Sequence, residues 1–222
     1  MHEEVRMEGF IRKVDDFSRF LEVISFSHAA ILNVTNIARE SEVKRKTVEN
    51  YLSILEDLLL SFQVPVFSHQ AKRDLIKHSK FYIFDAGVFQ MLRPKHFGDG
   101  PRTHLGPALE GIVAQHLRAW NDYSDETHLI AYWRTRSGLE VDFVVYGTKN
   151  FCAIEVKNAA KILPDDTKAL EVFLTDYPEA TAILLYRGNI KLRVGRVWCF
   201  PVEDWLLALK PNGPLTETRA IQ

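Results

Sequence analysis

The chain has 222 residues, 46% of them hydrophobic and 26% charged, which is an ordinary composition for one large or two small globular domains. The formal net charge of −1 argues against general affinity for polyanions, and the absence of any run of about 18 apolar residues argues against a membrane span. The first residues lack the apolar core of a secretory signal, so a cytoplasmic protein is expected.

Basic residues gather in the middle of the chain. Residues 68–118 carry eight Lys or Arg against four Asp or Glu, with five of the eight histidines. Such a segment faces either a phosphate backbone or solvent, and charge alone does not decide between them. The histidines lack HxH or HxxxH spacing, and no CxxC pair exists. We therefore expect no zinc site, and we expect Cys152 and Cys199 to be reduced thiols in the core.

Residues 1–95 are predicted to form a winged helix-turn-helix domain. Apolar residues recur at helical spacing and predict three helices, at residues 16–27, 36–40 and 46–59, the second capped by Thr35 or Asn33. Two apolar runs, at residues 60–67 and 81–84, are expected to pair as the wing, with Pro65 excluding the first from a sheet interior. Asp85 is expected to cap a following helix.

The predicted third helix opens with cations. Side chains at a recognition-helix amino terminus contact phosphates or base edges of DNA. This hypothesis assigns DNA contact to four residues: Lys44, Arg45, Lys46 and Thr47. Residues 1–67 are nevertheless net acidic, and winged helices also bind proteins, so both kinds of partner stay open.

Residues 96–222 are predicted to form a second domain, after a loop at residues 93–101 that Gly and Pro indicate. Period and composition predict helices at 105–120, 165–174 and 202–209 and strands at 129–134, 139–146, 151–156, 180–186 and 197–200. This order is typical of an α/β (α+β) fold, a mixed sheet flanked by helices.

Two neighbouring predicted strands carry acids at alternate positions. Strict alternation places Glu140 and Asp142 on one face, opposite Val141 and Phe143. It likewise places Glu155 and Lys157 together, and the turn at residues 147–150 predicts a hairpin that sets them beside Asp142.

Paired carboxylates repel one another unless a cation lies between them, and Mg²⁺ or Mn²⁺ suits such a site. Lys157 would then orient an attacking water, or help to deprotonate it. The same alternation also describes an ordinary solvent-facing strand. Nearby, Arg134 and Arg136 suit phosphate contact, whereas Trp133 is expected in the core.

Asp142 followed by Glu155-Val-Lys157 resembles the signature of the PD-(D/E)xK nuclease superfamily, whose restriction-endonuclease-like core has the same element order. The resemblance implies catalytic roles for Asp142, Glu155 and Lys157, with a further metal-ligating glutamate from the first helix, here Glu110. Four segments, at residues 80–87 (KFYIFDAG), 109–113 (LEGIV), 132–142 (YWRTRSGLEVD) and 153–157 (AIEVK), are similar to the DUF4143 family. Residues 38–52 resemble the winged helix found in that family.

Members of that family generally carry an AAA-type ATPase module ahead of this region. The present sequence has no GxxxxGK[ST] loop, so no ATP site is expected in it. It is expected to be the carboxyl-terminal part of an ATPase-family protein, or to work with a separate ATPase. The leading hypothesis is a magnesium-dependent nuclease acting on DNA. The alternatives are a non-catalytic platform that binds DNA or protein and a helix-turn-helix regulator, and a homo-oligomer stays open.

Overall fold

The computed structural model describes residues 2–93 and 104–216, with side chains from residue 13 onward. The amino-terminal elements are α1 (His2–Ser25), β1 (Ala30–Ile31), α2 (Val34–Glu40), α3 (Arg45–Asp57), β2 (Ser61–Val64), β3 (Lys80–Ile83) and α4 (Ala86–Leu92). After residue 104 follow α5 (Leu105–Asp122), β4 (Leu129–Arg134), β5 (Glu140–Tyr146), β6 (Phe151–Lys157), η1 (Pro164–Thr167), α6 (Lys168–Asp176), β7 (Thr181–Tyr186), β8 (Leu192–Val194), β9 (Val197–Pro201) and α7 (Val202–Ala208).

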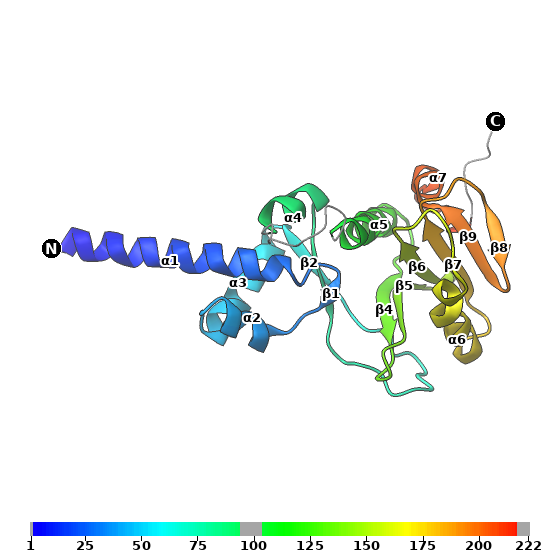
Figure 1. Ribbon diagram of the computed structural model, residues 1–222, viewed down its shortest axis with the longest axis horizontal. Helices are drawn as coiled ribbons and strands as arrows, with labels where there is room; N and C mark the ends of the chain where they lie inside the picture. The colour runs from blue at the N-terminus through cyan, green and yellow to red at the C-terminus, as the bar shows by residue number, and fades with distance from the viewer. Residues whose placement is uncertain (1, 94–103, 217–222) are drawn as a thin grey trace.

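The three expected amino-terminal helices are present, and the two apolar runs pair as antiparallel strands β2 and β3. Helix α1 begins at His2 rather than at residue 16, and it extends away from the rest of the molecule (Figure 1). Asn33 caps α2, because its side chain accepts a hydrogen bond from the Asn36 N–H at 3.1 Å. Asp85 caps α4 in the same way, through the Val88 N–H. The identification of this part as a winged helix-turn-helix stays a prediction.

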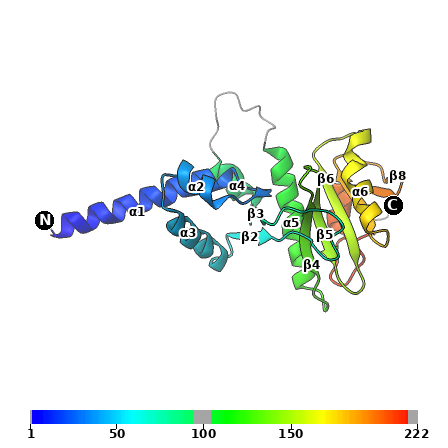
Figure 2. The ribbon, with the colours of Figure 1, turned by 90° about the horizontal axis from the view of Figure 1, so that it is seen from below.

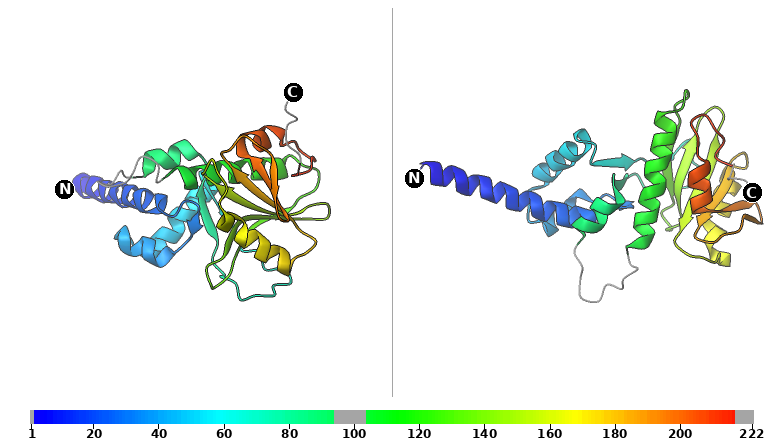
Figure 3. Two further views of the ribbon diagram at one scale, coloured as in Figure 1. Left: turned by 45° about the vertical axis from the view of Figure 1, so that its right-hand side comes forward. Right: turned by 90° about the horizontal axis from the view of Figure 1, so that it is seen from above.

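The carboxyl-terminal elements form the expected mixed sheet with helices on both faces. Its strand order is β4-β5-β6-β7-β9-β8, in which β6, β7 and β9 run parallel and the outer strands are antiparallel. Helices α5 and α7 cover one face and α6 covers the other (Figures 2 and 3). The α/β fold class is therefore confirmed. No described helix is both long enough and apolar enough to cross a membrane.

A β-bulge corrects the strict alternation expected for β5. Ala131 of β4 lies opposite Val144, but Trp133 lies opposite Val141, so three steps of β5 match two of β4. The extra residue falls between Val141 and Val144. As a result Val141 and Phe143 pack in different cores, on opposite faces of the sheet, rather than on one face as expected. Bulges of this kind re-aim side chains, and this one lies at Asp142.

The two parts of the chain are interwoven. The segment that joins β2 to β3 runs along the outer edge of β4, where the N–H and carbonyl of Tyr132 bond to the Pro65 carbonyl and the Phe67 N–H, at 2.9 and 2.6 Å. Farther on, the Ile76 N–H bonds to the Arg134 carbonyl at 3.2 Å. The predicted boundary near residue 95 stays a prediction, and most of the expected loop at residues 93–101 lies outside the described residues.

A buried histidine joins the amino-terminal part to α5. His28, which is 2% exposed, accepts a hydrogen bond at Nδ1 from the Ile83 N–H at 3.0 Å. Its Nε2 lies 3.1 Å from the Pro107 carbonyl, and this geometry requires a neutral ring with the proton on Nε2. Burial lowers the pKa of His28 to about 4. The ring fits against Gly111 of α5, where a Cβ atom would stand 2.5 Å from Nε2.

We expect Gly111→Ala to destabilise the protein by roughly 1–3 kcal/mol, because the new methyl group would displace a ring that is held by two hydrogen bonds. Gly106→Ala in the same helix meets open space, so it should be neutral or stabilising by at most about 1 kcal/mol. Urea unfolding of both variants measures the difference. Equal free energies of unfolding for the two variants would refute the tight contact.

His28 should also make folding sensitive to acid. Because its folded pKa lies below the ordinary 6.5, the unfolded chain takes up a proton first, and stability is lost as pH falls from about 6.5 towards 4. Between pH 7 and pH 5 the free energy of unfolding of the wild type should fall by roughly 2 kcal/mol more than that of His28→Gln. The two proteins share every other titrating group, so their difference reports on His28. Urea unfolding at both pH values measures this, with His116→Gln, at an exposed position, as the matched control.

Candidate functional site

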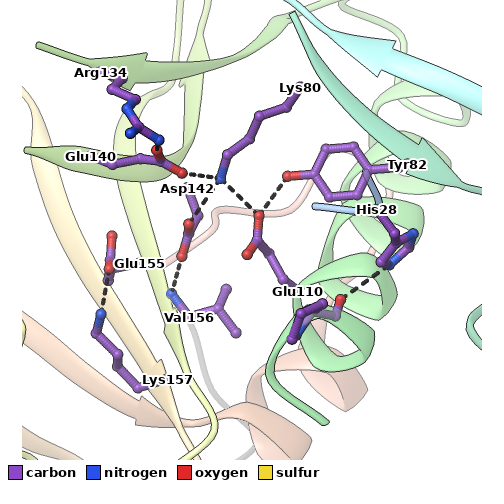
Figure 4. A network of polar contacts seen from close by, with 11 residues as sticks. His28, Lys80, Tyr82, Glu110, Arg134, Glu140, Asp142, Glu155, Val156 and Lys157 are labelled. Atoms are coloured by element: carbon purple, nitrogen blue, oxygen red, sulfur yellow. Dashed lines mark hydrogen bonds and ion pairs between the residues drawn. The ribbon is translucent and has the colours of Figure 1, made fainter. Parts of the chain in front are cut away.

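Strand β3 aims two polar side chains at the carboxyl-terminal part of the molecule. All four of its residues are buried. Phe81 and Ile83 pack in the core made with α1, α2 and α3, whereas Lys80 and Tyr82 point to the other side, towards α5 (Figure 4). The period of two along a strand accounts for this division. The apolar face of β3 thus packs in one hydrophobic core, and its polar face contributes side chains to an acidic site.

The ammonium of Lys80 lies among three carboxylates. Its Nζ atom is 2.9 Å from Glu110 Oε1 and 3.1 Å from Asp142 Oδ1, and it also pairs with Glu140 Oε1. The Lys80 side chain is only 1% exposed. An ammonium has three N–H donors, so each can serve one carboxylate. Burial alone lowers the pKa of Lys80, but the Tyr82 hydroxyl and the surrounding carboxylates together raise it well above its ordinary value.

Glu110 projects from the second turn of α5 and takes two hydrogen bonds on one oxygen. Its Oε1 accepts from Lys80 and, at 2.6 Å, from the Tyr82 hydroxyl. Burial and the negative charge of Asp142 raise the pKa of Glu110 to about 7, although Lys80 acts in the opposite direction. Glu110 is therefore a carboxyl group that titrates near neutrality.

Asp142 connects the hairpin to this network. The paired register of β5 and β6 ends at Phe143 opposite Ile154, and Asp142 is the next residue of β5 beyond that pair. Asp142 Oδ2 accepts a hydrogen bond from the Val156 N–H at 2.9 Å, while its Oδ1 faces Lys80. Both oxygens of this 7% exposed residue are thus engaged, one by each half of the site.

Glu155 and Lys157 share a face of β6 as expected. Lys157 Nζ lies 2.7 Å from Glu155 Oε1, but Glu155 Oε2 is buried and has no hydrogen-bond partner. Burial, and next the charge of Asp142, raise the pKa of Glu155 well above its ordinary value. For Lys157 burial lowers the pKa, but the Glu155 carboxylate, together with Asp142 and Asp166, outweighs burial and raises the pKa above its ordinary value. Lys157 is therefore a cation at neutral pH, which favours orientation of water over deprotonation.

The residues expected at the nucleic-acid interface fall into two groups. The first group lies at the start of α3, on the amino-terminal part of the molecule and not at the acidic site. In this group the side chains of Lys44, Arg45 and Lys46 are exposed, and that of Thr47 is half-buried. Arg134 Nη1 bonds to Glu140 Oε2 at 2.6 Å, whereas Arg136 pairs with Asp74 at the surface, at 2.8 Å. Trp133 is buried, as expected.

A divalent cation needs several oxygen ligands around one point. As the structure stands, with Lys80 in place, no group of three or more Asp, Glu, His or Cys side chains among the described residues could hold a metal ion. Lys80 lies between Glu110 and Asp142, so these two do not meet directly. Mg²⁺, however, commonly takes one or two carboxylates, with waters and a phosphate oxygen completing its shell. The unpartnered oxygen of Glu155 fits that requirement, and each engaged oxygen of Asp142 keeps a second lone pair for a cation. Glu110 is separated from these two carboxylates by Lys80.

Sequence reasoning did not assign a role to Lys80 or Tyr82. Residues 80–87 were singled out only as a family resemblance, and Lys80 followed by Tyr82 on one face of an apolar strand was the available signal. Glu140 was expected to share the face of Asp142, and both indeed contact Lys80. Both thiols are free and lie in the core, as predicted, and burial raises the pKa of Cys152 to about 12.

The fold and the site together define an α/β protein that carries a buried, cation-bridged acidic cluster at one face of a mixed sheet. Comparison with known families places residues 105–205, which hold Glu110, Asp142, Glu155 and Lys157, in DUF4143, a domain of unknown function. This region of the chain is thus similar to DUF4143, in agreement with the resemblance seen in the sequence. Residues 1–97 match a second domain of unknown function, DUF8612.

Two longer proteins are similar to this chain. One is an uncharacterized protein of Mycobacterium bovis and the other an uncharacterized protein of Mycobacterium tuberculosis. Each is 25% identical over 197 residues, which cover 87% of this chain and 41% of the relative. The chain thus spans about two fifths of the length of these relatives. No solved structure matches it significantly.

We expect Glu155→Gln to stabilise the fold in the absence of metal, because it removes a buried charge with one unpartnered oxygen. A gain of about 1 kcal/mol corresponds to roughly 2–4 °C in Tm for a chain of this size. Asp142→Asn is the matched contrast: both Asp142 oxygens are engaged, so this variant should lower Tm. Thermal unfolding in EDTA measures both, and a lower Tm for Glu155→Gln would contradict the assignment.

Proposed function

We propose that the acidic cluster is a nuclease-like site, which hydrolyses phosphodiester bonds of DNA with the help of Mg²⁺ or Mn²⁺. The observation that carries this proposal is the buried, unpartnered Oε2 of Glu155. The charge of Asp142 acts on the same Glu155 carboxyl, whose other oxygen, Oε1, accepts a hydrogen bond from the ammonium of Lys157. A carboxylate oxygen that is withdrawn from water without a donor is costly unless a cation completes it.

Asp142 and Glu155 would hold the cation. When bound, the cation would polarise the scissile phosphate and lower the pKa of a water. Lys157 supplies a fixed positive charge that orients this water and offsets charge on the phosphate as the new P–O bond forms. The P–O bond to the leaving oxygen would break as the new one forms, with the attacking water giving up a proton to solvent and the leaving oxygen taking one up from solvent. Glu110 supports the site through Lys80 and Tyr82, and it would join the cation only if Lys80 withdrew.

DNA contact is proposed for the exposed start of α3, where Lys44, Arg45, Lys46 and Thr47 are grouped. Arg134 and Arg136 are proposed to meet phosphates near the acidic site, in exchange for their present carboxylate partners. Association with an AAA-type ATPase, on a longer chain or a separate one, rests on the family resemblance, and the greater length of the mycobacterial relatives is consistent with it.

A second candidate function is a non-catalytic platform that binds DNA or an ATPase. One observation favours it: Lys80 already bridges Glu110 and Asp142, so part of the acidic charge is neutralised without a metal. A platform would keep its partner binding when Glu155 or Lys157 is replaced, whereas a nuclease would lose turnover.

Calorimetric titration with Mn²⁺ and cleavage of supercoiled plasmid DNA distinguish the two functions. We expect the wild type to bind Mn²⁺ and to nick the plasmid, and we expect Asp142→Ala to lose binding. Lys157→Ala should retain the ion but cleave at least about 100-fold more slowly, because the fixed charge at the phosphate is lost.

Two exposed positions provide matched controls. Glu203→Ala on α7 removes a carboxylate outside the site, and Lys168→Ala on α6 removes a lysine outside it. Both should bind and cleave like the wild type. A well-folded wild type that neither binds Mn²⁺ nor cleaves would rule out the nuclease and leave the platform.

A further inference from the structure

The most unusual group in the described part of the molecule is the ammonium of Lys80. It is withdrawn from solvent and lies on the acidic cluster, yet it comes from β3, outside residues 105–205. Its three contacts are carboxylates of two elements, Glu110 on α5 and Glu140 and Asp142 on β5. Lys80 also makes a cation–π contact with Tyr132, whose ring centroid lies 5.6 Å from Nζ.

The neighbours of these carboxylates are also fixed. Glu110 receives the Tyr82 hydroxyl, Glu140 receives Arg134, and Asp142 receives the Val156 N–H. Each carboxylate therefore has one donor of its own and shares Lys80. Without Lys80 the three carboxylates would face one common position, and the other cation paired with them, Arg134, is bound to the second oxygen of Glu140. Three carboxylates about a common point form an oxygen-rich site for a divalent cation.

We propose that Lys80 is the resident cation of the acidic cluster: a positioning residue that occupies what would otherwise be a three-carboxylate metal site formed by Glu110, Glu140 and Asp142. The inference deepens the proposed function, because it confines any catalytic cation to the side of Asp142 that faces Glu155. It also makes the amino-terminal part of the chain a contributor to the site, since the charge is delivered by β3.

Replacement of Lys80 by Met tests this role without reference to activity. In EDTA, Lys80→Met should lower Tm strongly, because it leaves the carboxylates to repel one another. Addition of Mn²⁺ alone should then raise the Tm of Lys80→Met by several degrees more than that of the wild type. Lys80→Arg keeps the charge and serves as the matched control, with no such extra response.

A double variant covers the case in which Lys80→Met does not fold by itself. Adding Glu110→Gln removes one of the three negative charges, so Lys80→Met/Glu110→Gln should recover Tm, or recover a cooperative transition, relative to Lys80→Met in EDTA. The double variant should also lose the extra Mn²⁺ response. If the changes in Tm caused by Lys80→Met and Glu110→Gln simply add in the double variant, the two residues are not coupled and the proposal is overturned. It is also overturned if Mn²⁺ raises the Tm of Lys80→Met no more than that of the wild type. Failure of the double variant to fold where Glu110→Gln alone folds overturns it as well.

The Tm measurements test the role of Lys80 independently of the proposed nuclease function. The cycle in EDTA concerns only the pairing of Lys80 with the carboxylates, and it holds or fails whether or not the wild type cleaves DNA. Loss of plasmid cleavage with an intact cycle would count against the nuclease and leave the resident cation in place.

Discussion

Withdrawing an ammonium from water is expensive, and the Lys80 site meets that cost by surrounding the charge with carboxylates. The cation comes from β3 and the anions come from α5 and β5. The buried charge of Lys80 is therefore neutralised by carboxylates from the other part of the chain. Lys80 thus joins β3 to α5 and β5, beside the apolar packing of Phe62, Val64 and Tyr82 in the same core. The His28 ring, seated against Gly111, ties the same two parts together a turn away.

Charge within the site is divided unevenly between two sides of Asp142. On the side of β3, Lys80, Tyr82 and Arg134 supply donors for Glu110 and Glu140. On the side of β6, Lys157 serves only one oxygen of Glu155. The first side resembles a finished structural ion pair network, and the second has unmet hydrogen-bonding capacity. A ligand that carries positive charge would consequently gain most on the second side, close to Lys157.

Local patterns in the sequence were sufficient for most elements of the fold. Alternation and turn residues placed the β5–β6 hairpin, and with it the neighbourhood of Asp142 and Glu155. The two-residue strand β1 and the three-residue strand β8 were missed, because such short segments show no period. Strict alternation failed at Phe143, where the bulge depends on pairing with β4. The role of Lys80 depends on contacts with residues 30 to 62 positions away, which no local pattern encodes.

The segment that follows β2 covers one of the two edge strands of the six-stranded sheet. By bonding to Tyr132 and Arg134, it covers part of the outer side of β4. The opposite margin ends in β8, only three residues long and carrying Arg193 at its centre. Exposed strand margins recruit other chains into aggregates, and short or charged margins resist this. The amino-terminal part thus covers an edge strand of the sheet, and a fragment reduced to residues 105–205 would leave that strand exposed to other chains.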